Sequence, residues 1–248
     1  PRSITEALRV PSSISAFSYD ILDQMAEETL RNPLRNVEGA EELDPKIAHI
    51  YKPYHIGGRY IASTDTSHGV GLDYSVTVVM DVRTGEVVAD IYGRDIKPTE
   101  LAAHSVKLLN YYHKPLWYPE NNDWGHEVIT TALDLGYKNF GYENDKKVEG
   151  REGIRTSPAT RIEIYGAVIP AVNNHQVIIY NKEGLKQFYD VIRNPEKNGR
   201  IEARRGGNDD YPVAVGICLA KMHNVTLTSQ SYAPIESLHF SGAQLGAM

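Results

Sequence analysis

The chain has 248 residues, of which 41% are apolar and 23% charged, and its 26 basic and 32 acidic side chains give a formal net charge of −6. This length suffices for one large domain, or one domain with extensions, and the composition excludes a collagen, a disordered tail and a disulfide scaffold. Cys218 is the only cysteine and has no internal disulfide partner, which favours a reducing cytoplasm. No apolar stretch approaches the roughly 18 residues that cross a bilayer, so we expect a soluble, non-secreted protein.

The first 55 residues alternate short amphipathic pieces with breakers such as Pro11-Ser12-Ser13 and Asn32-Pro33. We interpret this region as an arm or linker that contains one helix, at residues 19–30. From residue 56 the pattern changes to strands, at residues 59–65, 74–82 and 87–92. A turn joins the last two as a hairpin, so we expect three antiparallel strands to open the domain.

Helical and strand patterns then alternate, which is typical of an α/β domain. Short strands are predicted at 114–119, 137–142 and 177–180, and helices at 98–112, 124–135, from 157, from 181, and at 211–221. The domain is predicted to end near residue 224. Residues 225–248 show no clear periodicity and are interpreted as an irregular tail.

Three acidic positions lie where regular elements stop. Asp65 ends the first strand, Glu120 follows the strand at 114–119, and Asp209 and Asp210 precede the last helix. In an open α/β sheet, strand ends and helix starts are where a ligand site is assembled. Carboxylates that converge there would form the oxygen-only site that magnesium or manganese prefers.

Each of these acids also has a simple structural reading. Asp65 could start a turn, Glu120 could be a solvated loop residue, and Asn208, Asp209 and Asp210 could cap the helix that follows. Taken separately, none of the three signals is specific. Their combination and spacing carry the functional hypothesis.

In combination, these segments resemble the C-terminal nuclease domain of the large terminase subunit, the DNA-packaging motor protein of tailed bacteriophages. The resemblance spans roughly residues 57–223, and its most specific parts are the Glu-Asn-Asn-x-x-Gly pattern at 120–125 and the Asn-Asp-Asp pattern at 208–210. The segments at 62–65 and 71–75 and the apolar run at 214–220 also fit. Many members of the family have His where this chain has Asn208.

The resemblance implies a ribonuclease H-like fold, with a mixed five-stranded sheet, its first three strands antiparallel, and helices on both faces. It also implies a Mg- or Mn-dependent endonuclease that cuts concatemeric double-stranded viral DNA by two-metal hydrolysis. The family's acids fall on Asp65, Glu120, Asp209 and Asp210. Asp65 would bridge two divalent ions, Glu120 would hold the ion at the leaving group, and Asp209 or Asp210 the ion that activates water.

Two further residues are secondary candidates for the site. Asp73 could help shape it from the start of the second strand, although a turn-capping role is the simpler reading. His68 could contact phosphate or water, although a loop histidine is more often merely solvated.

A DNA-binding surface would need basic residues near the acids. Net acidity is a weak objection to nucleic acid, because bound divalent metal replaces basic charge locally. The candidates form two clusters, which are Lys146, Lys147, Arg151 and Arg155 in the first, and Arg204 and Arg205 in the second. A run of charged residues is, however, more often simply a face exposed to solvent.

The sequence contains no Gly-x-x-x-x-Gly-Lys-Ser/Thr phosphate loop. A complete large terminase subunit carries an ATPase motor, so residues 1–55 are interpreted as the remnant that leads to it, and no ATPase activity is expected here. The resemblance implies a small terminase subunit and a portal protein as partners. It also implies a place in the host-cell cytoplasm, transiently docked to the viral procapsid and not to a membrane.

Two other hypotheses compete with the packaging nuclease. One is a different ribonuclease H-like nuclease, such as a junction resolvase or a transposase core. The other is a non-catalytic docking module that binds the portal or the small subunit. The full set of carboxylates argues against a catalytically dead site.

Overall fold

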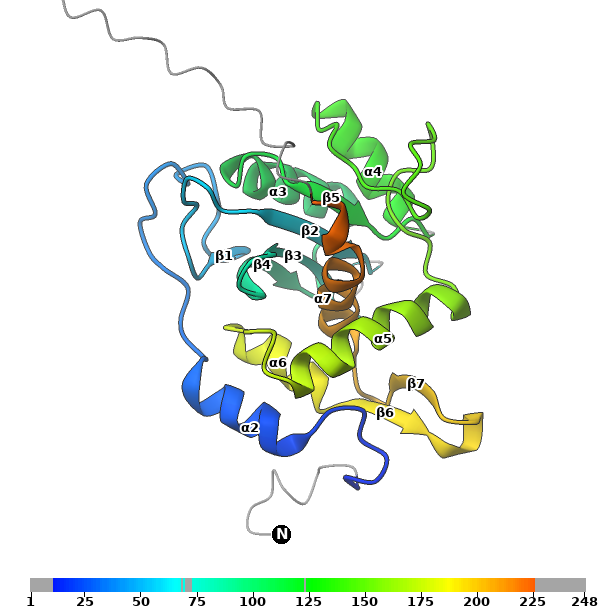
Figure 1. Cartoon of the computed structure of the whole chain (residues 1–248). Helices are drawn as coiled ribbons and strands as arrows, with labels where there is room; N and C mark the ends of the chain where they lie inside the picture. Colours follow the sequence, from blue (N-terminus) through cyan, green and yellow to red (C-terminus); the bar gives the residue numbers. More distant parts are fainter. Residues whose placement is uncertain (1–10, 68, 70–72, 123, 226–248) are drawn as a thin grey trace, which may run out of the picture.

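The computed structural model describes residues 11–225 except 68, 70–72 and 123. Its centre is a five-stranded mixed sheet with the strand order β1-β4-β3-β2-β5 (Figure 1). The strands β2, β3 and β4 pair antiparallel in sequence, as predicted, and β5 runs parallel to β2. The strands are β1 (Ala48–Ile50), β2 (Tyr60–Asp65), β3 (Ser75–Asp81), β4 (Glu86–Gly93) and β5 (Leu116–Pro119).

Helices cover both faces of this sheet, which confirms the predicted fold class. On one face α3 (Pro98–Tyr111) packs on β3 and β4, and α4 (Gly125–Asp134) packs on α3 and β5. On the other face α7 (Asp210–Lys221) lies directly against β2 and β3 (Figure 1). The outer helices of this face, with α5 and α6 on α7 and α2 on α6, are α5 (Pro158–Asn173), α6 (Lys182–Phe188) and α2 (Tyr19–Glu28).

Alternation along the strands divides the apolar core into two layers, one on each face of the sheet. Ile61 and Val78 belong to the layer under α5 and α7, whereas Ala62 and Val79 belong to the layer under α3. The helix α7 is buried nearly all round because it is sandwiched between the sheet and α5. The predicted apolar helix at 211–221 is therefore confirmed, and its N-terminus is held against the sheet.

Two predicted strands are wrong. Residues 137–142 and 177–180 make only isolated bridges, such as Trp117 to Phe140 and Glu86 to Ile178. In the first segment, the apolar pattern reflects aromatic packing, since Tyr137 and Phe140 pack on Trp117 at centroid distances of 5.2 and 5.3 Å.

Three short strands were not predicted. β1 supplies the fifth strand of the main sheet. Separately, β6 (Val191–Asn194) and β7 (Arg200–Ala203) form a two-stranded hairpin. Three or four residues are too few for a period-2 pattern to stand out in a sequence. Two 3₁₀ turns, Pro195–Lys197 and Met222–Asn224, complete the described elements.

The described part of the N-terminal region packs on the domain. Phe17, Leu22 and Met25 are buried in the core layer under α5, and β1 extends the main sheet through its antiparallel pairing with β4. An attachment of this region to a motor domain stays a prediction. In the described part of the chain, no helix combines the length and apolarity required to pass through a membrane.

Candidate active site

Asp65 faces the α7 side of the sheet. Side chains alternate along β2, and Ser63, two residues earlier, donates its Oγ hydrogen to the carbonyl oxygen of Ala214 in α7 at 2.5 Å. Thr64 points the other way and accepts a bond from Trp117 Nε1 at 2.9 Å. The last residue of β2 therefore places its carboxylate on the face that also receives the start of α7.

Glu120 is brought beside Asp65 by the parallel pairing of β5 with β2. The Glu120 N–H donates to the carbonyl oxygen of Thr64 at 2.7 Å. Asn122 Nδ2 donates to Glu120 Oε1 at 2.9 Å and to the carbonyl oxygen of Thr156 at 3.1 Å, which fixes the carboxylate against the loop before α5.

The glycine of the Glu-Asn-Asn-x-x-Gly pattern has a steric reason. A Cβ on Gly125 would lie 1.7 Å from the carbonyl oxygen of Glu120, well inside contact distance. Only glycine allows the chain after Glu120 to fold back so tightly that α4 begins at once. The pattern therefore builds the turn that presents Glu120 and Asn122.

Asp209 and Asp210 stand at the N-terminus of α7. Gln187 and Asp90 hold this end of the helix, because the Tyr211 N–H donates to Gln187 Oε1 at 2.7 Å and the Tyr211 hydroxyl to Asp90 Oδ2 at 2.8 Å. Both bonds are buried. The two acids are thus carried by a fixed helix start.

The two neighbouring acids have different partners. Asp209 Oδ2 accepts hydrogen bonds from the Tyr165 hydroxyl at 2.5 Å and from Arg161 Nη2. Asp210 Oδ2 is buried and is one of the few such atoms with no hydrogen-bond partner among the described residues. An orphaned carboxylate oxygen that is nevertheless buried is the observation that fits a bound cation.

The carboxylates also affect one another electrostatically. Burial raises the pKa of Asp65 well above its ordinary value, and the charges of Glu120 and Asp210 and a hydrogen bond with Glu120 raise it further. Burial and the charges of Asp209 and Asp73 raise the pKa of Asp210 to about 7. Such mutual repulsion is typical of acids gathered for a positive ligand.

This gathering is not a closed metal cage. Among the described residues, no group of three or more His, Cys, Asp and Glu side chains is arranged so that it could hold a metal ion as it stands. The acids are close enough to raise each other's pKa values while Asp209 is turned to Arg161. The donor set consists of carboxylate oxygens, which suits a hard divalent cation such as magnesium.

The other predicted site residues differ in how they relate to the acids. Asp73 lies near enough to Asp210 to raise its pKa, while His68 lies outside the described residues. Arg204 pairs with Asp190 at 2.7 Å, and Arg205 and Lys147 are exposed.

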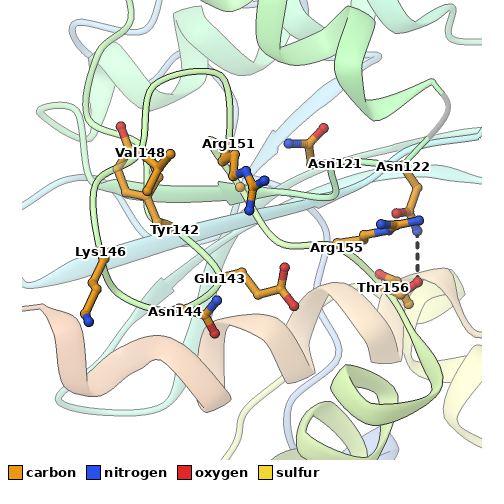
Figure 2. Close-up of a pocket in the computed structure, with 11 residues that line it drawn as sticks. Asn121, Asn122, Tyr142, Glu143, Asn144, Lys146, Val148, Arg151, Arg155 and Thr156 are labelled. Atoms are coloured by element: carbon orange, nitrogen blue, oxygen red, sulfur yellow. Dashed lines mark hydrogen bonds between the residues drawn. The ribbon is translucent and has the colours of Figure 1, made fainter.

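Three of the basic candidates share one pocket. Lys146, Arg151 and Arg155 line a cavity of about 720 Å³, together with Asn122 and Thr156 (Figure 2). Arg155 lies at the end where Asn122 is bonded to Thr156, and Asn122 is the residue that also holds Glu120. The basic pocket therefore adjoins the Glu120 side of the acid cluster.

The sequence reasoning missed Arg161, the cation nearest to the acids by its contacts. Its guanidinium pairs with Asp209, and its carbon Cζ lies 5.4 Å from the centroid of the Tyr165 ring, four residues along α5. A single basic residue in the first turns of an otherwise apolar helix, with a tyrosine at i+4, was the available signal.

Comparison with known proteins bears on the fold. No protein-family model and no curated protein sequence matches the chain, but several solved structures do. The chain shares the fold of large terminase nuclease domains. The magnesium-bound and cobalt-bound large terminase nucleases of thermophilic phage G20c match with TM-scores of 0.62 and 0.63, at 18% and 17% identity, over 85% of this chain and 99% of each of theirs. The large terminase nuclease domain of Thermus phage P74-26 matches with a TM-score of 0.57 at 18% identity, over 84% of this chain and 94% of that one.

Proposed function

We propose that the protein is a metal-dependent endonuclease that cuts double-stranded DNA during phage genome packaging. The observation that supports this proposal is that Asp65 at the end of β2 lies close enough to Glu120 and Asp210 for their charges to raise its pKa. In an α/β sheet, strand ends and helix starts such as these are where ligand sites form. The shared fold with terminase nucleases, some of them solved with magnesium, cobalt or zinc, supports the same reading.

Asp65, Glu120 and Asp210 would hold two Mg or Mn ions. Asp65 is placed centrally in this set because the charges of both Glu120 and Asp210 raise its pKa. Asp210 is preferred to Asp209 because its buried Oδ2 lacks a partner, whereas the Oδ2 of Asp209 is already bonded to Arg161 and Tyr165. When bound, the ions would supply an activated water and a stabilised leaving oxygen for phosphodiester hydrolysis. Asn122 would keep Glu120 oriented through its bond to Oε1.

The DNA backbone would enter along the pocket that Lys146, Arg151 and Arg155 line. Cations there can neutralise phosphates and so offset the negative charge of the acid cluster. Arg204 stays a weaker candidate because it already pairs with Asp190. Arg205 and Lys147 are weaker because they are not among the residues that line this pocket. By the same family likeness, the partners would be the small terminase subunit and the portal protein, at the procapsid in the host cytoplasm.

The proposal is tested by plasmid nicking with Mg²⁺ or Mn²⁺, without ATP. Cleavage is expected for the wild type, to be lost in chelator, and to fall at least 10²-fold in Asp65→Asn. Asp134→Asn, which removes an exposed acid on α4, is the matched control and is expected to cut normally. Full cleavage by Asp65→Asn would contradict the proposal. Preference for four-way junctions over linear duplex would favour a resolvase instead, and absence of all cleavage a docking module.

A further inference from the structure

Arg161 lies inside the candidate site but has no part in holding metal. It extends from the second turn of α5, and its Nη2 donates to Asp209 Oδ2. The Tyr165 hydroxyl donates to the same oxygen at 2.5 Å, so Asp209 is held from two positions on α5. The charge of Asp65 also contributes to the electrostatic environment of the guanidinium.

Among the described residues, Nη2 is the only nitrogen of this guanidinium that makes a hydrogen bond. Arg161 Nε is buried and has no hydrogen-bond acceptor among the described residues. An arginine presents its five N–H donors as a fork that matches carboxylate and phosphate oxygens in pairs. A buried N–H without an acceptor is unfavourable, so its retention beside the acid cluster points to a function for this guanidinium.

The same side chain is also reachable from outside. Arg161 lines a cavity of about 510 Å³ between α5 and the β6–β7 hairpin, and its side chain retains 24% of its exposure. Burial lowers the pKa of Arg161, but its interactions with Asp209 and Tyr165 raise it more, so the group stays positive. A permanently charged fork that pairs with Asp209 and is partly open to this cavity suits an anionic ligand.

We propose that Arg161 is a catalytic residue that binds the phosphate being cut, through the part of its guanidinium that is neither paired with Asp209 nor buried. Asp209 and Tyr165 are then positioning residues, which fix the fork so that it faces the phosphate. This inference rests on the proposed nuclease function, and it separates the roles of two adjacent acids: Asp210 for metal and Asp209 for the arginine.

An arginine that binds the phosphate has an effect that a purely structural ion pair would not have. A fixed positive charge next to Asp65 repels an incoming divalent cation, so Arg161 weakens metal binding while it assists cleavage. Removal of the charge should therefore change the two properties in opposite directions. Loss of a merely structural contact would weaken both.

The experiment compares four versions of the 248-residue chain: wild type, Arg161→Gln, Arg161→Lys and the control Arg193→Gln. Arg193 lines the same cavity but lies on β6 and makes no side-chain bond to the acids described here. Mn²⁺ affinity is measured by isothermal titration calorimetry without DNA, and single-turnover cleavage is measured at saturating Mn²⁺. Thermal unfolding confirms that each variant is folded.

Arg161→Gln is expected to bind Mn²⁺ about fivefold to tenfold more tightly, since one unit of repulsion is removed, and to cut about 10²-fold more slowly. Arg161→Lys keeps the charge and loses the fork, so its Mn²⁺ affinity should stay within about twofold while cleavage falls about tenfold. Arg193→Gln should match the wild type in both.

Equal or weaker Mn²⁺ binding by Arg161→Gln would overturn the proposal, as would tighter binding with unchanged cleavage. If Arg161→Gln does not fold, Arg161→Lys decides, because wild-type cleavage by that variant would remove the need for a guanidinium. The calorimetry needs no nuclease activity. If no protein cuts DNA but Arg161→Gln binds Mn²⁺ more tightly, the proposed function fails while the electrostatic role of Arg161 stands.

Discussion

Asp210→Asn should make the metal-free protein more stable at alkaline pH. Burial and the charges of Asp209 and Asp73 raise the pKa of Asp210 from 3.8 to about 7. A carboxyl whose pKa is higher in the folded state contributes stability below its unfolded value of 3.8, and this stability is lost as the pH rises through about 7. Above that pH the folded protein carries an ionised Asp210 in an unfavourable environment.

The magnitude follows from the difference between about 7 and 3.8, which corresponds to about 4 kcal/mol as an upper bound. Although its Oδ2 is buried, Asp210 as a residue is partly exposed, so solvent screening reduces the expected gain to roughly 1–2 kcal/mol. Urea unfolding with chelator, from pH 5 to pH 8, measures the free energy of unfolding of both proteins. The advantage of Asp210→Asn should grow with pH and level off above about 7.

A control variant and the addition of Mg²⁺ test the same effect. Asp134→Asn, on the exposed side of α4, should change stability by less than about 0.5 kcal/mol at any of these pH values. Saturating Mg²⁺ should stabilise the wild type and leave Asp210→Asn nearly unchanged, because ligand binding stabilises only a protein that binds it. A metal-free Asp210→Asn protein that is less stable than the wild type at pH 8 would refute the reasoning.

Three further predictions concern the supports of the site. Gly125→Ala places a Cβ 1.7 Å from the carbonyl oxygen of Glu120. It should therefore lower the free energy of unfolding by about 1–3 kcal/mol in urea and weaken Mn²⁺ binding, and unchanged values for both would contradict the steric account. Asn122→Ala removes the bond to Glu120 Oε1 and should weaken Mn²⁺ binding by about tenfold to 10²-fold in calorimetry, whereas equal affinity would show that Glu120 needs no support. Burial lowers the pKa of His49, but its hydrogen bond and ion pair with Asp90 raise it more. The stability that this pair contributes is therefore present below pH 6.5 and lost as the pH rises through the raised pKa. The unfolding temperatures of the wild type and His49→Gln, measured from pH 5.5 to 8.5, should converge at high pH, and a constant difference between them would exclude the effect.

The sequence predicted the positions of the acids better than their partners. Asp65 ends β2 and Glu120 directly follows β5, so local patterns place both acids at strand ends. The parallel pairing of these two strands then brings the ends together. The pairing of Asp209 with Arg161 depends on how α5 crosses α7. That crossing is set by side-chain packing between residues far apart in the chain, which no local pattern records.

The errors in the predicted sheet have a related cause. β1 has three residues and is a strand only because β4 offers it an edge. Residues 137–142 have the composition of a strand, yet Tyr137 and Phe140 are apolar because they pack on Trp117. In both segments, tertiary context overrides local preference.

The central claim is that separate parts of the chain bring Asp65, Glu120 and Asp210 together to hold divalent metal. Anomalous diffraction from crystals soaked in Mn²⁺ tests it most directly. The account predicts manganese peaks in contact with carboxylate oxygens of Asp65, Glu120 and Asp210, with Asp209 still bonded to Arg161. Manganese bound at another place, or none bound by these three residues at saturating concentration, would contradict it.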